Sequence, residues 1–289
     1  MSTVLTSRPL RKLAALSGIM RPLVAGQAML YVLLGAYLGG SAADILSARA
    51  LTAGLVVGLV VACGYVVNDA CDVAVDMLSR PERAIPSGRV SLSQAHVFAL
   101  ALAAGALAAA LTLGPALALF ALATIALSLT YSLALKNTVL LGNLAMALLD
   151  GSIILYGSLA VGHLPAATLV VFVLIFLYIT AQEILYTLDD VEGDARSGVR
   201  TIATRWGMAR ALGAFRLAII AFVAAAVLPP LLHLVPLRFL YALIPCTLVP
   251  TLALVWLVSR HPTSRNLHRV PRLMKLVWLA SLIPVLLLR

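Results

Sequence analysis

Charged residues are scarce in this chain. Asp, Glu, Lys and Arg make up 11% of its 289 residues, whereas hydrophobic residues make up 62%. A soluble domain is closer to half apolar and a quarter charged. Because a globular core of this length cannot bury so much apolar surface, the composition excludes a soluble protein and predicts an integral membrane protein.

Cysteine is also rare, and its positions form no pattern. Cys63, Cys71 and Cys246 are scattered, without a CxxC pair or metal-ligand spacing, which excludes a disulfide framework. The net charge of +10 would suggest nucleic acid binding in a soluble protein. In a membrane protein, basic residues are better interpreted as topology signals and lipid-headgroup contacts. We therefore expect the lipid bilayer, and no nucleic acid, as a partner.

Long apolar segments alternate with polar connections along the whole chain. The first, from Pro22 to Gly40, is longer than the apolar core of a signal peptide and predicts a transmembrane helix instead of a cleaved leader. No segment shows the alternating pattern of a membrane β-strand, so we expect an all-α polytopic protein. The prediction is a single domain over residues 1–289, with nine spans near 22–40, 51–69, 92–112, 115–134, 138–161, 166–188, 209–232, 237–258 and 271–288.

Basic residues are distributed unevenly between the two sides of these spans. Lys and Arg accumulate in cytoplasmic connections, so the richer side predicts a cytoplasmic N-terminus and an external C-terminus. The Ala- and Arg-rich composition suggests a high-GC bacterium, and hence an inner or plasma membrane. The richer side receives Arg8, Arg11, Lys12, Arg21, Arg80, Arg83, Arg89, Lys136, Arg196, Arg200, Arg205, Arg210, Arg260, Arg265, Arg269, Arg272 and Lys275, and the other side receives Arg49, Arg238 and Arg289.

Two connections on the predicted cytoplasmic side begin with acidic residues and then become basic. They read NDACDVAVDMLSRPERAIPSGR from residue 68 and LDDVEGDARSGVR from residue 188. Residues four apart share one face of a helix, so each connection presents a row of oxygen-bearing side chains. The first acidic row is Asn68, Asp72 and Asp76, with Asp69 beside it, and the second acidic row is Asp190 and Asp194, with Glu183 deeper in the sixth span.

Such rows need a cation. Like charges four residues apart repel each other, and acids near hydrocarbon carry a desolvation cost. In one interpretation the nearby arginines pair with the acids in a solvated collar. In the other, the two rows hold Mg²⁺, which takes one or two carboxylates together with water and substrate phosphate, while arginines bind the outer phosphate oxygens. The recurrence of the pattern favours Mg²⁺ and a diphosphate. A transporter is a weaker alternative, because carriers place their sites near the midplane of the membrane.

At these residues the chain resembles the UbiA superfamily of intramembrane prenyltransferases. That family carries NDxxDxxxD after its second helix and a motif ending in DxxxD after its sixth, and this sequence has NDACDVAVD at 68–76 and DVEGD at 190–194. RPERAIPSGRVS at 80–91 and YSLALK at 131–136 also match. The resemblance implies nine helices around a central cavity and the transfer of a prenyl group from an isoprenyl diphosphate to a hydrophobic or aromatic acceptor.

The resemblance also implies roles for individual residues. Asp72, Asp190 and Lys136 would be catalytic. Many members of the family have a Lys-Asp pair where this chain has Tyr186 and Thr187, so the second acidic row lacks one carboxylate. Two Mg²⁺ ions are expected, one held by Asn68, Asp72 and Asp76 and the other by Asp190 and Asp194, and substrate is expected at Arg83, Arg89, Lys136, Tyr131, Glu183 and Asp69, with the Tyr131 ring facing a cation.

Two classes of acceptor are compatible with these motifs. RPERAIPSGRVS is most similar to members that alkylate glycerol-phosphate lipids or chlorophyll-type acceptors, whereas quinone-pathway members share much of the same sequence. Because quinone-pathway members are more numerous, we expect a small aromatic or quinone-type acceptor. A glycerol-phosphate lipid, a chlorophyll-type acceptor and a terpene cyclase of the same family remain alternatives.

Overall fold

Helices make up all the regular structure of the described residues, which are 8–196 and 198–289 of the computed structural model. Nine helical segments in these ranges are long and apolar enough to cross a bilayer, which confirms the predicted all-α class with nine spans. The first seven residues of the predicted domain lie outside the described part. The spans are α2 (Pro22–Gly39), α3 (Ala48–Cys71), α5 (Leu92–Leu113), α6 (Pro115–Leu133), α7 (Leu141–Ala160), α8 (Ala166–Asp189), α10 (Ile202–Leu231), Leu237–Arg260 and Ser264–Leu288.

The last two spans each consist of several helical pieces, and short helices connect the others. Proline accounts for some of these interruptions, because it removes a backbone donor and clashes with the preceding turn. Pro245 lies in a π-helical turn, and Pro271 lies within a helix. The remaining elements are α1 (Arg8–Ile19), η1 (Ala42–Asp44), α4 (Val73–Ser79), η2 (Leu135–Asn137), α9 (Val191–Arg196), α11 (Leu237–Leu243), η3 (Ile244–Leu248), α12 (Val249–Arg260), α13 (Ser264–Ala280), α14 (Leu282–Val285) and η4 (Leu286–Leu288).

Four helix starts differ from the predicted spans. The second begins at Ala48 instead of 51, directly after the Ser47 cap. The fifth span begins at Leu141 instead of 138, because Leu140 adopts a positive φ of 68° and interrupts the helix. The seventh and ninth begin earlier, at Ile202 and Ser264, in polar sequence that a search for apolar segments does not include. In α10 the helix is bent at Gly207, whose φ of 82° is not helical.

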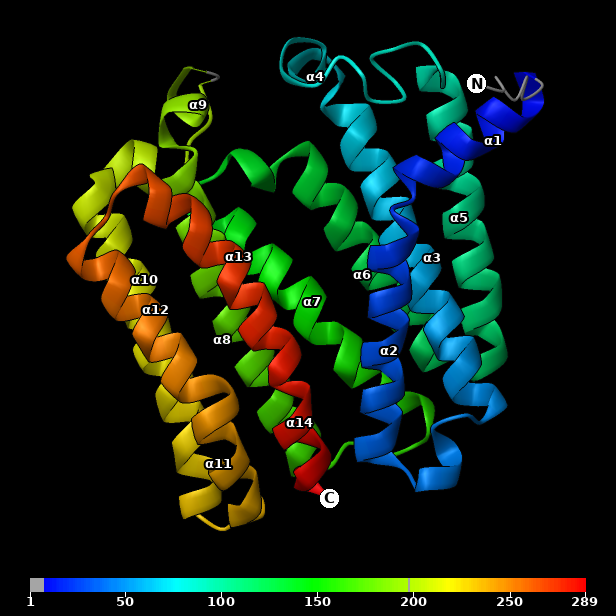
Figure 1. Cartoon of the computed structure of the whole chain (residues 1–289). Helices are drawn as coiled ribbons and strands as arrows, with labels where there is room; N and C mark the ends of the chain where they lie inside the picture. Colours follow the sequence, from blue (N-terminus) through cyan, green and yellow to red (C-terminus); the bar gives the residue numbers. More distant parts are fainter. Residues whose placement is uncertain (1–7, 197) are drawn as a thin grey trace, which may run out of the picture.

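The spans form two groups that share one helix (Figure 1). In Figure 1, α2, α3, α5 and α6 lie on one side of the molecule, and α8, α10, α12 and α13 on the other. Helix α7 runs between the groups and packs against α2 and α6 as well as α8. It contributes Ile154 to the hydrophobic core of the second group and Tyr156 to that of the first. Helix α7 therefore belongs to both helix groups.

The contact between α2 and α7 depends on glycine. A Cβ atom on Gly157 would lie 2.0 Å from the carbonyl oxygen of Val32, and one on Gly35 would lie 2.3 Å from the carbonyl oxygen of Ile154. Small residues allow helix backbones to approach closely in membranes, where packing contributes much of the association energy. The two glycines thus hold α7 against the first group.

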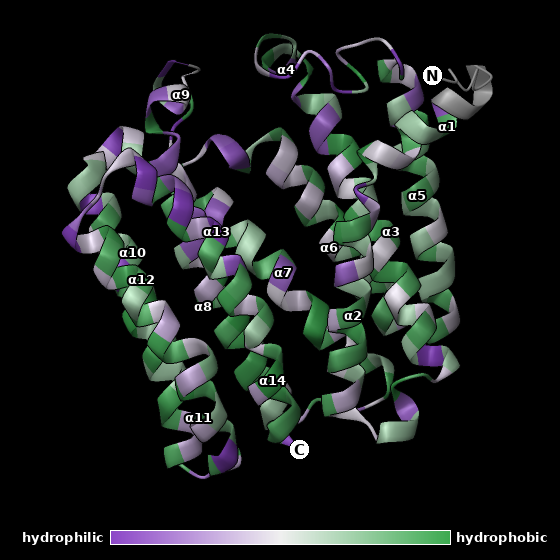
Figure 2. Cartoon of the chain, viewed as in Figure 1, coloured by the Kyte–Doolittle hydropathy of each residue, from purple (hydrophilic) through white to green (hydrophobic). Residues whose placement is uncertain are grey.

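Polar residues gather at one end of the bundle (Figure 2). The helices are coloured mainly as hydrophobic along their middle parts, whereas purple segments concentrate near α4 and α9. Both short helices directly follow a span, since α4 follows α3 and α9 follows α8. We call this end of the molecule the motif end, because both acidic rows lie there.

Candidate active site

The two acidic rows share one local backbone geometry. Asp72 is the C-cap residue of helix α3 and Asp190 is that of helix α8, with φ, ψ angles of −93°, 7° and −107°, 21°. A short helix follows each of these aspartates. The chain still keeps its helical spacing, since the N–H of Asp76 donates to the carbonyl of Asp72 and that of Asp194 donates to Asp190, both at 2.8 Å. The similarity of the two motifs thus extends from sequence to backbone.

Cations already neutralise the first acidic row. The Lys136 ammonium contacts Asp72 Oδ1, and the Asn68 amide donates to Asp72 Oδ2 at 3.0 Å. Arg83 Nη1 lies 2.7 Å from Asp76 Oδ2, and the Asp76 side chain is only 7% exposed. The structure therefore shows, for this row, the pairing with basic residues that was the weaker of the two interpretations of the sequence.

Asp69 belongs to the same ion-pair network. Its Oδ1 lies 3.1 Å from Arg21 Nη2 and 3.4 Å from Arg83 Nη1. Arg21, which the sequence presents as a topology signal, also lies 4.2 Å from the centre of the Tyr65 ring. Buried acids are retained only when charge partners compensate for their lost hydration. Arg21 and Arg83 thus join α3, α4 and the start of α2.

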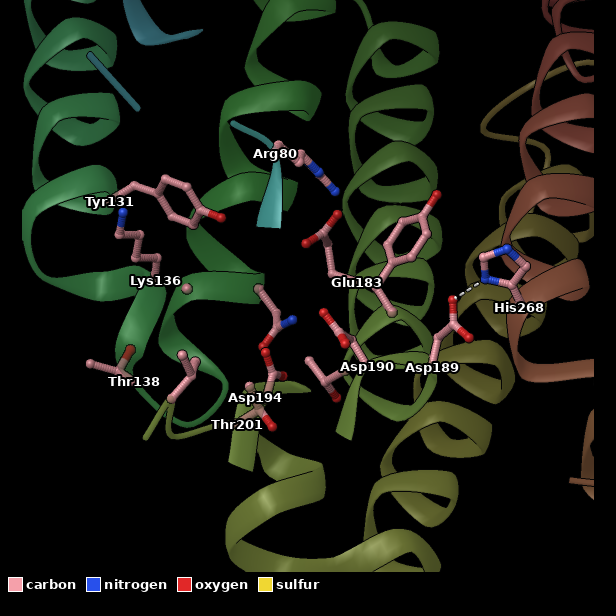
Figure 3. Close-up of a pocket in the computed structure, with 15 residues that line it drawn as sticks. Arg80, Tyr131, Lys136, Thr138, Glu183, Asp189, Asp190, Asp194, Thr201 and His268 are labelled. Atoms are coloured by element: carbon pink, nitrogen blue, oxygen red, sulfur yellow. Dashed lines mark hydrogen bonds and ion pairs between the residues drawn. The ribbon is translucent and has the colours of Figure 1, made fainter. Parts of the chain in front are cut away.

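The second acidic row lines a cavity of about 540 Å³. Figure 3 shows Tyr131 and Lys136 on one side of this cavity and Glu183 and Asp190 on the other. Asp194 completes the polar lining near Asp190. Neither Asp190 nor Asp194 forms an ion pair with any described residue, so this row differs from the first in having no cation of its own.

The electrostatics of the second acidic row favour a cation. Burial, and then the negative charge of Asp190, raise the pKa of Asp194 to about 6. Gly193 leaves room for the Asp190 carboxylate, because a Cβ atom there would lie 2.3 Å from Asp190 Oδ1. These are hard oxygen donors with unbalanced charge, which suits Mg²⁺. Among the described residues no three His, Cys, Asp or Glu side chains converge, so water or substrate phosphate would complete the coordination of an ion here.

The structure brings together only some of the predicted site residues. Tyr131, Lys136, Glu183, Asp190 and Asp194 line the cavity. No residue of the first acidic row is part of this lining. Lys136 is the link between the two acidic rows, because it contacts Asp72 and also lines the cavity. The side chains outside the lining are Asn68, Asp69, Asp72, Asp76, Arg83 and Arg89.

Arg89 differs most from its predicted position at a phosphate. Its guanidinium donates to the carbonyl of Glu82 and, through Nε, to Ser87 Oγ at 3.0 Å. These bonds close the loop that connects α4 to α5. Arg80 lines the cavity instead, and it belongs to the same RPERAIPSGRVS segment. The sequence pattern located an arginine-bearing loop but did not distinguish which arginine faces the cavity.

Other cavity residues were missed by the sequence analysis. His268 Nδ1 lies 2.8 Å from Asp189 Oδ2, and both side chains line the cavity. These residues are 79 positions apart, so no local pattern could have paired them. Asp150 in α7 is outside this lining and was missed as well, although a carboxylate within a membrane span is itself a sign of function.

The chain is similar to known proteins in sequence and in fold. The sequence model of the UbiA prenyltransferase family matches residues 28–280. A digeranylgeranylglyceryl phosphate synthase of Methanopyrus kandleri is 38% identical over 271 residues, which cover 92% of this chain and 97% of that protein. Two solved structures have the same fold. A digeranylgeranylglyceryl phosphate synthase gives a TM-score of 0.83 at 23% identity, covering 96% of this chain and 98% of the other. A UbiA homologue from Archaeoglobus fulgidus bound to dimethylallyl diphosphate and Mg²⁺ gives 0.69 at 18% identity, covering 95% and 99%.

Proposed function

Because this chain belongs to the UbiA prenyltransferase family, we propose that it transfers a prenyl group from an isoprenyl diphosphate to a hydroxyl of a glycerol-phosphate lipid. The observation that carries this proposal is the similarity to a digeranylgeranylglyceryl phosphate synthase over nearly the whole length of both chains. The name of that product indicates two geranylgeranyl groups on one glyceryl phosphate. The proposed donor is therefore geranylgeranyl diphosphate, and the proposed acceptor is a glyceryl phosphate that already carries one geranylgeranyl chain.

This proposal replaces the acceptor that the sequence analysis put first. A small aromatic or quinone-type acceptor was preferred there because such family members are numerous, which is an argument from frequency and not from a residue. The similarity to the synthase favours the glycerol-phosphate alternative. The RPERAIPSGRVS segment, which is most similar to members that alkylate glycerol-phosphate lipids or chlorophyll-type acceptors, was the better indicator.

The donor diphosphate is proposed to bind at the motif end of the cavity. Asp190 and Asp194 supply oxygen ligands for Mg²⁺, while Lys136 and Arg80 supply positive charge from the other elements. The homologue that binds dimethylallyl diphosphate together with Mg²⁺ supports this assignment. When bound, Mg²⁺ would supply the charge that stabilises the departing diphosphate.

A second ion at Asn68, Asp72 and Asp76 is also proposed. This row has the same backbone geometry as the second row, which supports a common role. Its carboxylates now contact Lys136 and Arg83. An ion would take over part of this neutralisation, and the released Lys136 ammonium could turn to the diphosphate. Arg83 would continue to hold the buried Asp76.

The remaining cavity residues would protect the reacting carbon. The spans around the cavity are apolar, and exclusion of water prevents hydrolysis of an ionised prenyl group. Tyr131 lines the cavity opposite Glu183, and an aromatic face stabilises positive charge at short range. We propose that Tyr131 stabilises the charge that develops on the prenyl group as diphosphate leaves.

The chain is a multi-pass membrane protein, and its orientation is part of the proposal. The uneven distribution of Lys and Arg supports a cytoplasmic motif end and an external C-terminus. The relatives named above are archaeal, so the expected bacterial source and inner membrane have no support from them. A single domain is proposed because α7 belongs to the hydrophobic cores of both helix groups.

The test is transfer by the purified protein in lipid nanodiscs. Geranylgeranyl diphosphate and Mg²⁺ are supplied with geranylgeranylglyceryl phosphate or with 4-hydroxybenzoate, and products are identified by mass spectrometry. We expect an ether product from the lipid alone, and none after chelation of the metal. Alkylated benzoate without ether would instead support the aromatic acceptor, and a cyclic hydrocarbon formed without any acceptor would support a cyclase.

A further inference from the structure

Four carboxylates line the cavity, and three of them already have an assignment. Asp189 pairs with His268 at 2.8 Å. Asp190 and Asp194 form the second acidic row. The fourth, Glu183, forms no ion pair or hydrogen bond with any described residue. A carboxylate in a membrane span that is exposed to a cavity and lacks a partner is a candidate for a functional group.

Glu183 is placed where the reacting carbon should lie. It precedes Asp190 by seven residues on α8, which corresponds to roughly 10 Å along the helix towards the middle of the membrane. A prenyl diphosphate held at Asp190 by its phosphates would extend its chain in this direction. Figure 3 shows the Glu183 carboxylate projecting into the cavity on the side facing Tyr131. The first atoms of the prenyl chain would therefore pass beside Glu183.

Besides the charged residues that line the cavity with it, charged groups of two other helices influence Glu183. They are Asp150 of α7 and Lys275 of α13. The Lys275 ammonium lies 5.5 Å from the centre of the Tyr186 ring, one turn from Glu183 on α8. Helix α13 is held there by two hydrogen bonds from α8, since Tyr178 donates to the Met274 carbonyl and Gln182 to the Pro271 carbonyl, both at 2.9 Å. These contacts place Lys275 of α13 next to the turn of α8 that contains Glu183 and Tyr186.

Alkylation of an alcohol requires a base, and the proposed metal-binding residues do not supply one. A glycerol hydroxyl must lose its proton as it is alkylated, and general-base catalysis requires a group within hydrogen-bond reach of that proton. We propose that Glu183 is this general base, an inference that rests on the proposed ether-forming function. The acceptor oxygen forms a bond to prenyl C1 while the bond from C1 to the diphosphate oxygen breaks. The hydroxyl proton goes to Glu183, and the electron pair of the broken C–O bond leaves with diphosphate.

The test compares two acceptors in the full-length protein. One is geranylgeranylglyceryl phosphate, and the other carries a thiol in place of its free hydroxyl. A thiol loses its proton far more readily than an alcohol, so it depends less on a base. In Glu183→Gln we expect transfer to the alcohol to fall about 100-fold or more, and transfer to the thiol to fall much less. Glu82→Gln, at an exposed glutamate of the α4–α5 loop, is the matched control and should behave as wild type with both acceptors.

Binding of geranylgeranyl thiodiphosphate with Mg²⁺ shows whether the variant retains its donor site. If Glu183→Gln is not recovered as folded protein, Glu183→Asp carries the same comparison, because it withdraws the carboxylate by one methylene. Equal losses with alcohol and thiol, or no loss with either, would overturn the role of Glu183. Absence of ether formation by the wild-type protein would instead overturn the proposed function, so the two failures are distinguishable.

Discussion

The Lys136 ammonium contacts the Asp72 carboxylate and thereby joins η2 to the end of α3, across 64 residues of sequence. The same lysine lines the cavity that contains Asp190 and Asp194. One cation is therefore positioned between the two acidic rows. In the proposed reaction it has two successive partners, the Asp72 carboxylate before substrate binds and the diphosphate afterwards.

Substitution of this lysine should weaken donor binding. Lys136→Met preserves much of the side-chain length but removes the charge, and a charge-assisted bond to phosphate contributes about 1.5 to 3 kcal/mol. We expect the affinity for geranylgeranyl thiodiphosphate, measured by calorimetry with Mg²⁺, to fall by roughly tenfold or more. Lys12→Met in α1, at an exposed position, is the control. Equal affinities in the two variants would contradict the role of Lys136.

The second acidic row should be required for turnover but not for folding. Asp190→Asn and Asp194→Asn keep the shape of each side chain and remove its charge. Loss of one group that stabilises a developing charge typically lowers the rate by about 10²- to 10³-fold, and we expect at least that loss here. Glu192→Gln on the same short helix is the matched control, because Glu192 is exposed and pairs with Arg196. Thermal unfolding should be nearly unchanged in all three.

Metal affinity should depend on pH through Asp194. Its pKa is raised to about 6 by burial and by Asp190, so the carboxyl is largely protonated below that pH and must release its proton before it binds a cation. Mg²⁺ affinity should therefore fall as the pH decreases through about 6, and binding near that pH should release a proton. Calorimetry in buffers of different ionisation enthalpy measures this release. It should be absent in Asp194→Asn.

Arg83 should contribute more to the stability of the fold than Arg89 does. Arg83 is paired with the buried Asp76 and with Asp69, and removal of one partner from a buried ion pair costs about 3 kcal/mol or more. Arg83→Met should lower the unfolding temperature measurably in detergent, whereas Arg89→Met, at an exposed loop position, should have a small effect. A larger loss of stability in Arg89→Met would show that the loop bonds of Arg89 are the more important ones.

The contact between α2 and α7 should not tolerate a methyl group. Gly157→Ala places Cβ against the Val32 carbonyl, and overpacking of this kind costs about 1 to 3 kcal/mol. Gly26→Ala is the control within α2, because no atom lies within 4 Å of its Cβ position. We expect a lower unfolding temperature for Gly157→Ala and an unchanged or higher one for Gly26→Ala.

Much of the candidate site could be recognised from the sequence because its signals are local. Asp72 and Asp76, like Asp190 and Asp194, are four residues apart, and this spacing alone places each pair on one side of its segment. The directions of the loop arginines, in contrast, could not be predicted from the local sequence. Arg80, Arg83 and Arg89 lie in one short segment, yet one lines the cavity, one holds two buried acids and one closes the loop. Their directions depend on which acids other helices present to them.

The amino-acid sequence by itself determined the helical membrane class, since apolar runs of spanning length can satisfy their backbone groups in lipid only as helices. It also determined the two acidic motifs and, through them, the family. Only the tertiary structure decided that the first acidic row is neutralised by Lys136 and Arg83, while the second forms no ion pair with any residue that the structure describes. It alone placed His268 and Arg80 at the cavity. The physical reason is that ion pairing acts over a few ångströms in space, and helix packing, not sequence distance, decides which charges come that close.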